Sequence, residues 1–271
     1  MSVFKGVARD WLPPILVRWL CRMRGVGVRF EGDYATWEEA RSRCTGYDAQ
    51  VILEKVLAAT LKVKHGGAAF ERDSMLFDEV DYAWPVLAGL MWAAASEGGR
   101  LNVLDFGGAL GSVYFQHRSL LVTLQDARWN VVEQPHFVEA GQKYIQDERL
   151  RFYKTVDECV TENRPNVILL SSVLQYLENP YGLLEEMGNL NAGRIIVDRT
   201  PFIKGDKDVL SVQQVPESIF SATLPAWLLS EAAFEDTMDK LGYVLVARMP
   251  CEDGYGERFS LKGYLYCRGK S

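Results

Sequence analysis

Short, almost uninterrupted apolar runs recur along the C-terminal two thirds of the chain, and polar residues or glycine follow most of them. These runs cover residues 101–106, 129–132, 150–153, 166–170 and 194–198. Runs of this length are typical of strands that are covered on both faces of a parallel sheet. Segments of helical character, such as 137–145, separate them. The pattern therefore predicts an α/β fold with a mostly parallel sheet.

The chain closes on a different pattern. After a helix with Ser230 as its expected N-cap and Gly242 as its stop, two strands are expected at 243–247 and 263–267. A polar segment that contains glycine joins these two strands, which therefore form a hairpin.

Residues 31 to about 98 have a mainly helical pattern. Thr36 is the expected N-cap of one helix, and Glu39 completes a capping box with it. Two interpretations are open for residues 69–78, which either fold over a ligand site as a lid or form an ordinary surface connection.

The most informative segment runs from Leu101 to Ser112 and predicts a buried strand, a glycine-rich turn and the start of a helix. Gly107, Gly108 and Gly111 let the backbone turn sharply and approach a ligand closely, because glycine has no Cβ. Asp105 ends the strand, where open α/β sheets place their ligands.

This loop fits one nucleotide-cofactor pattern better than another. The dinucleotide fingerprint G-x-G-x-x-G fails, because Ala109 and Ser112 stand at its later glycine positions. The loop instead resembles the acidic-x-G-x-G-x-G loop of class I S-adenosylmethionine (SAM) methyltransferases, which Asp105, Gly107 and Gly111 match. Ala109 replaces the middle glycine. A tight turn without a ligand is the remaining interpretation.

Residues beyond the loop extend the resemblance. Glu133, followed by Gln134, ends the next strand about twenty residues after the last glycine, the offset at which a carboxylate accepts hydrogen bonds from a ribose. In the family, the same carboxylate binds the ribose of SAM.

The segment after the fourth strand also resembles the family. It contains Ser171, Ser172 and Gln175, and the resemblance places these residues near the methionine part of the cofactor. Tyr176 stands where the family often has histidine, so a histidine base is not carried over. For each side chain of this segment, a core-facing helical position is the alternative.

Candidate catalytic residues follow the fifth strand. Methyl transfer to a hydroxyl benefits from a general base, and Asp198 is the first candidate for that base or for a group that orients the substrate. Arg199 beside it suits a phosphate or carboxylate of the substrate, although a local ion pair is the structural alternative. Tyr176 and His117 are further candidates.

The pocket for the methyl acceptor has two candidate lining residues, Gln213 and Trp227, with a core position as the alternative for Trp227.

Composition excludes several classes of protein. The chain has 271 residues, 48% of them hydrophobic, and a net charge of −6, which argues against a nucleic-acid partner. Its five cysteines are widely spaced and odd in number, which indicates a reducing, cytoplasmic setting rather than a disulfide framework. Neither they nor the three histidines have the spacing of a metal site.

The N-terminus differs from the rest of the chain. Residues 1–30 hold six basic residues and one acidic residue, a net charge of +5 that leaves −11 for the remainder. Tryptophans and aliphatic residues lie between these charges. The segment either packs on the acidic body of the protein or lies at the inner face of a membrane as a peripheral contact. No span or cleavable signal peptide is expected.

Four motifs together resemble a group of bacterial methyltransferases from lipopolysaccharide and other surface-polysaccharide gene clusters. They lie at residues 105–112, 132–134, 174–180 and 198–202. The resemblance implies a doubly wound, mostly parallel, seven-stranded Rossmann-like sheet over 98–271, with a basic segment and helical cap over 1–97.

The same resemblance implies an activity. SAM is the expected methyl donor, S-adenosylhomocysteine the product, and a small-molecule or sugar hydroxyl the acceptor. Two alternatives stay open, a non-catalytic SAM-binding accessory protein of a polysaccharide assembly complex and an NAD-dependent oxidoreductase.

Overall fold

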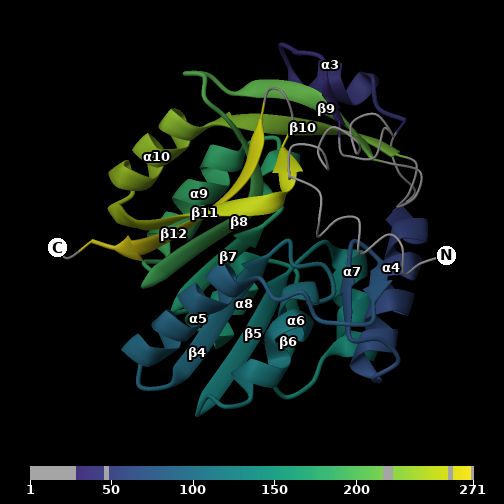
Figure 1. Ribbon diagram of the computed structural model, residues 1–271, viewed down its shortest axis with the longest axis vertical. Coiled ribbons are helices and arrows are strands. Elements are labelled where there is room, and N and C mark those ends of the chain that lie inside the picture. Colours follow the sequence, from purple (N-terminus) through teal and green to yellow (C-terminus); the bar gives the residue numbers. More distant parts are fainter. Residues whose placement is uncertain (1–28, 46–48, 216–221, 256–258, 270–271) are drawn as a thin grey trace, which may run out of the picture.

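The computed structural model describes residues 29–45, 49–215, 222–255 and 259–269 (Figure 1). Almost all of the basic N-terminal segment lies outside these residues. Among the helices that are described, none has the length and apolar character needed to cross a membrane.

Seven strands form the main sheet, and their order confirms the predicted doubly wound α/β fold. Five are parallel neighbours, namely β6 (Leu150–Tyr153), β5 (Asp126–Val132), β4 (Arg100–Phe106), β7 (Val167–Ser171) and β8 (Arg194–Ile203). Next to β8 lie β12 (Ser260–Arg268), antiparallel to it, and β11 (Tyr243–Tyr255), which closes the sheet as the predicted hairpin. The winding direction reverses between β4 and β7, where open sheets bind ligands.

Helices cover both faces of this sheet (Figure 1). One core joins a face of the sheet to α4 (Ala49–Lys64), α5 (Trp84–Ser96), α6 (Ser112–Leu121) and α7 (Pro135–Ala140), which a π-turn at Gly141–Ile145 extends. The second core joins the other face to α8 (Val156–Glu162), α9 (Pro180–Asn189) and α10 (Glu231–Lys240). Successive residues of β4 alternate between the two cores, as strand geometry requires: Val103 belongs to the first and Leu104 to the second.

Local side-chain caps begin several of these helices where the sequence predicts them. Thr36 caps α3 (Trp37–Ser42) by accepting a hydrogen bond from the Glu39 amide, and the Glu39 carboxylate accepts one from the amide of Ala35. Ser230 caps α10 by accepting from the Ala233 amide. Both predicted N-caps are confirmed.

The helices α3, α4 and α5 dominate the described part of residues 31–98, as expected. A second, antiparallel sheet was not expected. It consists of β1 (Arg29–Glu31), β9 (Val209–Val215) and β10 (Ala222–Ser230), and we call it the cap sheet. A separate hairpin, β2 (Phe70–Arg72) and β3 (Met75–Phe77), lies within the same N-terminal region. Of these strands, β1, β2 and β3 escaped prediction because strands of three residues have almost no periodicity of their own.

The cap sheet joins the main sheet where β7 ends. β7 pairs with β8 only as far as Ser171 and Asp198, whereas β8 continues to Ile203. The end of β10 takes the place of β7 there and pairs in parallel with β8 through Leu229 and Ser230.

Residues on both sides of position 97 share these layers. The helix α5 contributes to the first core, and β1 pairs with β9 of the cap sheet. The division into 1–97 and 98–271 stays a prediction.

Trp227 anchors the cap sheet to the segment that follows β7 and to α3. Its indole nitrogen donates a hydrogen bond to the Leu177 carbonyl at 3.0 Å, and its ring stacks on Trp37 of α3 with centroids 6.3 Å apart. A small cluster of Ala40, Leu210 and Val212 packs beside it.

We expect Trp227→Ala to lower the free energy of unfolding by about 2–3 kcal/mol, slightly less than for a fully buried aromatic residue. Hydrogen exchange should accelerate in β9 and β10 and stay unchanged in β4, because the anchor serves only the cap sheet. Trp84→Ala is the control: Trp84 is 61% exposed, and its loss should cost less than about 1 kcal/mol. Equal acceleration in β4 would contradict the anchor role.

Candidate functional site

The predicted cofactor residues meet at the C-terminal edge of the main sheet. The loop 107–111 follows β4, Glu133 follows β5, and Ser172 follows β7. Backbone hydrogen bonds tie these ends together: Gly107 N donates to Val132 O at 2.9 Å, and Glu133 N donates to Tyr153 O at 3.1 Å. The loop 107–111, Glu133 and the segment from Ser172 therefore form one continuous surface across neighbouring strands, which we call the ledge.

Asp105 lies beneath this ledge and is 1% exposed. The Trp129 indole donates a hydrogen bond of 2.8 Å to its Oδ2, while Oδ1 is buried without a partner. Burial raises the pKa of Asp105 to about 7, although the bond from Trp129 acts in the opposite direction. A Cβ at position 108 would collide with the carboxylate, so only glycine fits there.

The loop above Asp105 turns through three left-handed residues, Gly107 (φ +71°), Ala109 (φ +49°) and Gly111 (φ +87°). Two of the three are the glycines that the motif requires, and Ala109 adopts a conformation that costs an alanine energy. Gly111 is the N-cap of α6 and has no side chain to cap it, so the first turn of this helix presents backbone N–H groups at the ledge.

Glu133 stands at the end of β5 beside the loop and is partly buried. Its Oε2 accepts a hydrogen bond of 2.9 Å from the Gln134 amide, and burial raises its pKa. Gln134 is exposed and serves as the N-cap residue of α7.

Side chains after β7 form a chain of hydrogen bonds toward β8. The Ser171 hydroxyl donates to Asp198 Oδ2 at 2.9 Å, and the Ser172 amide donates to the Asp198 carbonyl at 2.9 Å. Gln175 donates to the Ser172 hydroxyl at 3.0 Å, and its own amide oxygen is buried without a partner. The structure thus brings Ser171, Ser172, Gln175 and Asp198 together.

Asp198 and Arg199 form a β-bulge. The register of β8 and β12 pairs Val197 with Tyr264 and Thr200 with Lys262, so both bulged residues oppose Gly263 alone. Arg199 has φ +47°, and its Nε lies 3.8 Å from Asp198 Oδ2. The local ion pair that the sequence left open is therefore present, and the bulge aims the two side chains out of the regular pleat.

The two further candidates occupy different surroundings. His117 has no exposed surface, its Nδ1 lies 3.0 Å from the Val113 carbonyl, and burial lowers its pKa. Tyr176 is 36% exposed, and burial of its hydroxyl raises its pKa, while hydrogen bonds from Gln213 and Gln175 act in the opposite direction.

Sequence reasoning missed one residue of this site, Glu71. It lies on β2 within the segment 69–78, is 1% exposed, and accepts a hydrogen bond from the Ser112 hydroxyl at the start of α6. The hairpin β2–β3 thus packs beside the glycine loop. A glutamate between Phe70 and Arg72 has no local pattern that would mark it as buried.

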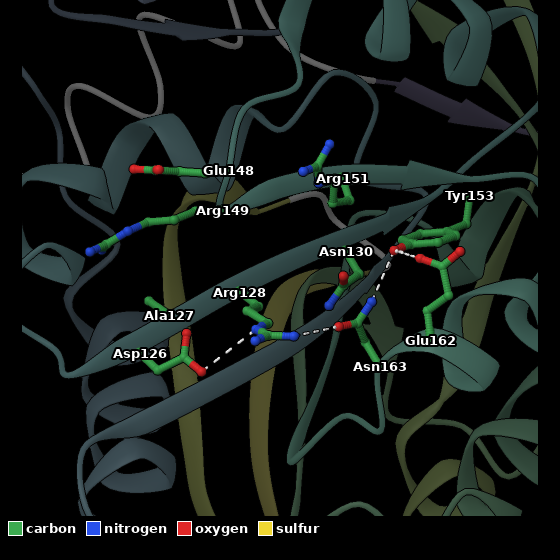
Figure 2. A pocket seen from close by; sticks show the side chains of 10 residues that line it. All are labelled: Asp126, Ala127, Arg128, Asn130, Glu148, Arg149, Arg151, Tyr153, Glu162 and Asn163. Carbon is green, nitrogen blue, oxygen red and sulfur yellow. Dashed lines mark hydrogen bonds and ion pairs between the residues drawn. The ribbon is translucent and has the colours of Figure 1, made fainter.

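A cavity of about 560 Å³ lies elsewhere, along β5 and β6 (Figure 2). Several of its charged and polar side chains contact one another: Arg128 contacts Asp126 and Asn163, and Tyr153 bonds to Asn163 and Glu162. None of the predicted site residues lines it. Within the described parts of the chain, no cluster of histidine, cysteine and acidic residues has a metal-binding arrangement.

No protein-family model matches the sequence, and no curated protein matches it. Solved structures do resemble the fold. The N-terminal domain of EvdMO1, crystallised in the presence of S-adenosylhomocysteine and D-fucose, has 12% identity and a TM-score of 0.49, over 80% of this chain and 97% of that one.

Two further similar structures are named methyltransferases. Magnesium protoporphyrin IX methyltransferase from Synechocystis PCC 6803, with bound SAM, has 13% identity and a TM-score of 0.46, over 83% of this chain and 99% of that one. A SAM-dependent methyltransferase from Clostridium acetobutylicum has 10% identity and a TM-score of 0.45, over 68% and 90%.

The burial of Asp105 predicts a pH-dependent stability. The pKa of Asp105 is raised in the folded protein, so the protonated side chain favours the folded state. Its contribution to the free energy of unfolding is therefore complete below about pH 4 and is lost as the pH rises through about 7. Asp105→Asn is neutral throughout. This variant should therefore increase the free energy of unfolding at pH 8 by up to about 4 kcal/mol, and raise the unfolding midpoint accordingly. The gain at pH 5 should be much smaller.

Thermal unfolding of both proteins at the two pH values measures this difference. Asp206→Asn, on the exposed connection between β8 and β9, is the control and should change neither midpoint. A gain of the same size at pH 5 and pH 8 for Asp105→Asn would show that Asp105 is not the titrating group.

Proposed function

We propose that this protein is a SAM-dependent methyltransferase that acts on a hydroxyl group of a small-molecule or sugar acceptor. The observation that carries the proposal is the ledge at the switch point, where the glycine loop over Asp105 adjoins Glu133 on the next strand. That pairing suits an adenosyl cofactor, since Glu133 can accept hydrogen bonds from a ribose beside a loop that a ligand can approach closely.

Each side chain of the ledge has a role in this proposal. Glu133 and Gln134 hold the ribose end of the cofactor. The glycines at 107, 108 and 111 let the cofactor approach the backbone closely. The methionine end is bordered by Ser171, Ser172 and Gln175. When bound, SAM supplies an electrophilic methyl group. The protein must hold the acceptor oxygen in line with that group.

Asp198 is the proposed base. Its carboxylate receives the proton that the acceptor hydroxyl loses as the new oxygen–carbon bond forms, and Ser171 and Arg199 hold the carboxylate in place. Arg199 binds an anionic group of the acceptor, while Tyr176, Gln213 and Trp227 line the acceptor side beneath the cap sheet. We assign His117 a packing role, because it has no exposed surface.

The biological setting belongs to the same proposal. The sequence resemblance supports a sugar precursor of a bacterial surface polysaccharide as the acceptor and the cytoplasm as the location. Residues 1–30 are the proposed peripheral contact with the inner face of the membrane, and residues 1–97 the proposed cap.

Thermal unfolding with SAM, S-adenosylhomocysteine and NAD, each in excess, tests cofactor binding. A ligand at 100 times its dissociation constant stabilises by about 2.7 kcal/mol, which predicts a midpoint rise of roughly 5–10 °C. We expect the rise with SAM and S-adenosylhomocysteine alone, and its loss in Glu133→Ala. Glu139→Ala, which removes only an exposed ion pair with Lys154, should keep it.

The outcome with each ligand decides between the alternatives. A rise with NAD alone would favour the oxidoreductase, and no rise with any of the three would contradict the proposal.

Asp198→Asn separates an enzyme from an accessory protein. The variant should keep the midpoint rise with SAM but release S-adenosylhomocysteine 10²- to 10⁴-fold more slowly in the presence of a panel of monosaccharides and nucleotide sugars. If the wild-type protein binds SAM and releases no S-adenosylhomocysteine with any acceptor of the panel, the accessory role is favoured.

A further inference from the structure

Glu71 is a buried carboxylate for which the described structure offers no counter-ion. Its Oε1 accepts a hydrogen bond from the Ser112 hydroxyl, and its Oε2 accepts one of 3.3 Å from the Ser74 amide. No basic side chain of the described residues forms an ion pair with it. Burial raises its pKa, whereas the more distant charge of Arg199 lowers it. Burying a carboxylate without a cation is costly, so such a residue calls for a positively charged partner.

The position of Glu71 places it at the candidate cofactor site. Ser112 directly follows Gly111, the last glycine of the loop, so the carboxylate adjoins the loop at the first turn of α6. The strand β2, which carries Glu71, packs against α6, and Phe70 of the same strand stacks on Phe77 of β3.

The tip of the same hairpin is a tight turn with an uncommon backbone conformation. Its two turn residues, Asp73 and Ser74, both have left-handed backbone conformations with φ +52° and +66°. The charge of Asp73 raises the pKa of Glu71 and also that of Tyr176. Non-glycine residues keep such conformations only where the surrounding structure holds them.

The proposed cofactor brings the missing cation. In the proposed function, Glu133 would hold the ribose of this cofactor, and Ser171, Ser172 and Gln175 would border its amino-acid end. Two groups at the candidate cofactor site can take a positively charged donor: the carboxylate of Glu71, which accepts hydrogen bonds but has no ion pair, and the buried amide oxygen of Gln175, which has no donor. An α-ammonium group supplies both a positive charge and several hydrogen-bond donors.

We propose that Glu71 of the β2–β3 hairpin receives the α-ammonium group of the cofactor and so couples the hairpin to cofactor binding. This inference rests on the proposed function. It extends the cofactor site from the Rossmann-like sheet to an N-terminal segment that the nucleotide-binding motif does not include.

Two ligands that differ only at the amino-acid end test the inference. S-adenosylhomocysteine carries the ammonium group, whereas 5′-methylthioadenosine has the same adenosine and thioether without the amino acid. By isothermal titration calorimetry, Glu71→Gln should weaken binding of S-adenosylhomocysteine at least tenfold and leave that of 5′-methylthioadenosine within about twofold. Glu79→Gln, on the exposed segment after the same hairpin, should change neither.

Other results would overturn the inference in distinguishable ways. Equal weakening of both ligands would mean that Glu71 only supports the hairpin. Unchanged or tighter binding of S-adenosylhomocysteine would mean that Glu71 does not meet its ammonium group. If the wild-type protein binds neither ligand, the proposed function itself fails and this inference with it.

A measurement on the wild-type protein covers the case in which Glu71→Gln does not fold. The ratio of the two affinities should shift against S-adenosylhomocysteine as the pH falls from 8 to 5, because a protonated Glu71 loses its attraction for an ammonium group. Since burial raises the pKa of Glu71, this shift should begin above the pH at which an exposed glutamate titrates. A constant ratio would overturn the inference.

Discussion

The unequal lengths of β7 and β8 are the constraint on which the site depends. Beyond Asp198, the edge of β8 that β7 leaves open still carries backbone groups that need hydrogen-bond partners, and β10 supplies them. The same step holds the cap sheet above the segment after β7. It also coincides with the bulge opposite Gly263, where a Cβ would lie 3.0 Å from the Val197 carbonyl. The candidate catalytic residues Asp198 and Arg199 and the attachment of the cap sheet therefore both depend on the irregular C-terminal part of β8.

The parts that the sequence predicts correctly have local causes. The strand 150–153 and the cap at Ser230 are encoded by neighbouring residues. The glycines of the loop from Gly107 to Gly111 predict its tight turn. The position of Glu133 at the end of β5 could be predicted because an apolar strand precedes it directly in the sequence. In each case, the signal and the structure lie within a few residues of one another.

The parts that escaped prediction depend on distant partners. Residues 209–215 pair with β10, which follows closely in the sequence, but their other partner is β1 near the start of the described chain, so their central place in the cap sheet depends on a distant strand. The bulge at Asp198 and Arg199 exists only through the register with β12, and Glu71 is buried only because a hairpin meets α6. Burial of a single charged residue leaves no periodic trace in the sequence.

Three carboxylates around one loop, Asp105, Glu133 and Glu71, have pKa values raised by burial. Each therefore makes the folded state less stable at neutral pH than a neutral side chain of the same shape would. Proteins commonly have a lower free energy of unfolding because the side chains of a functional site are less favourable for folding than other side chains would be. The three carboxylates around this loop fit that pattern.

The pairing of Phe30 on β1 with Gln213 on β9 has a consequence for synthesis of the chain. At about 5–20 residues per second, the ribosome delivers β9 roughly 10–40 s after β1. During that interval, β1 lacks its partner β9 and is an unpaired strand in a growing polypeptide. The cap sheet is thus completed late, after most of the parallel sheet has been made. A nascent chain released after β8 is complete but before residue 222 would contain every strand of the ledge and lack β10, the strand that joins the cap to it.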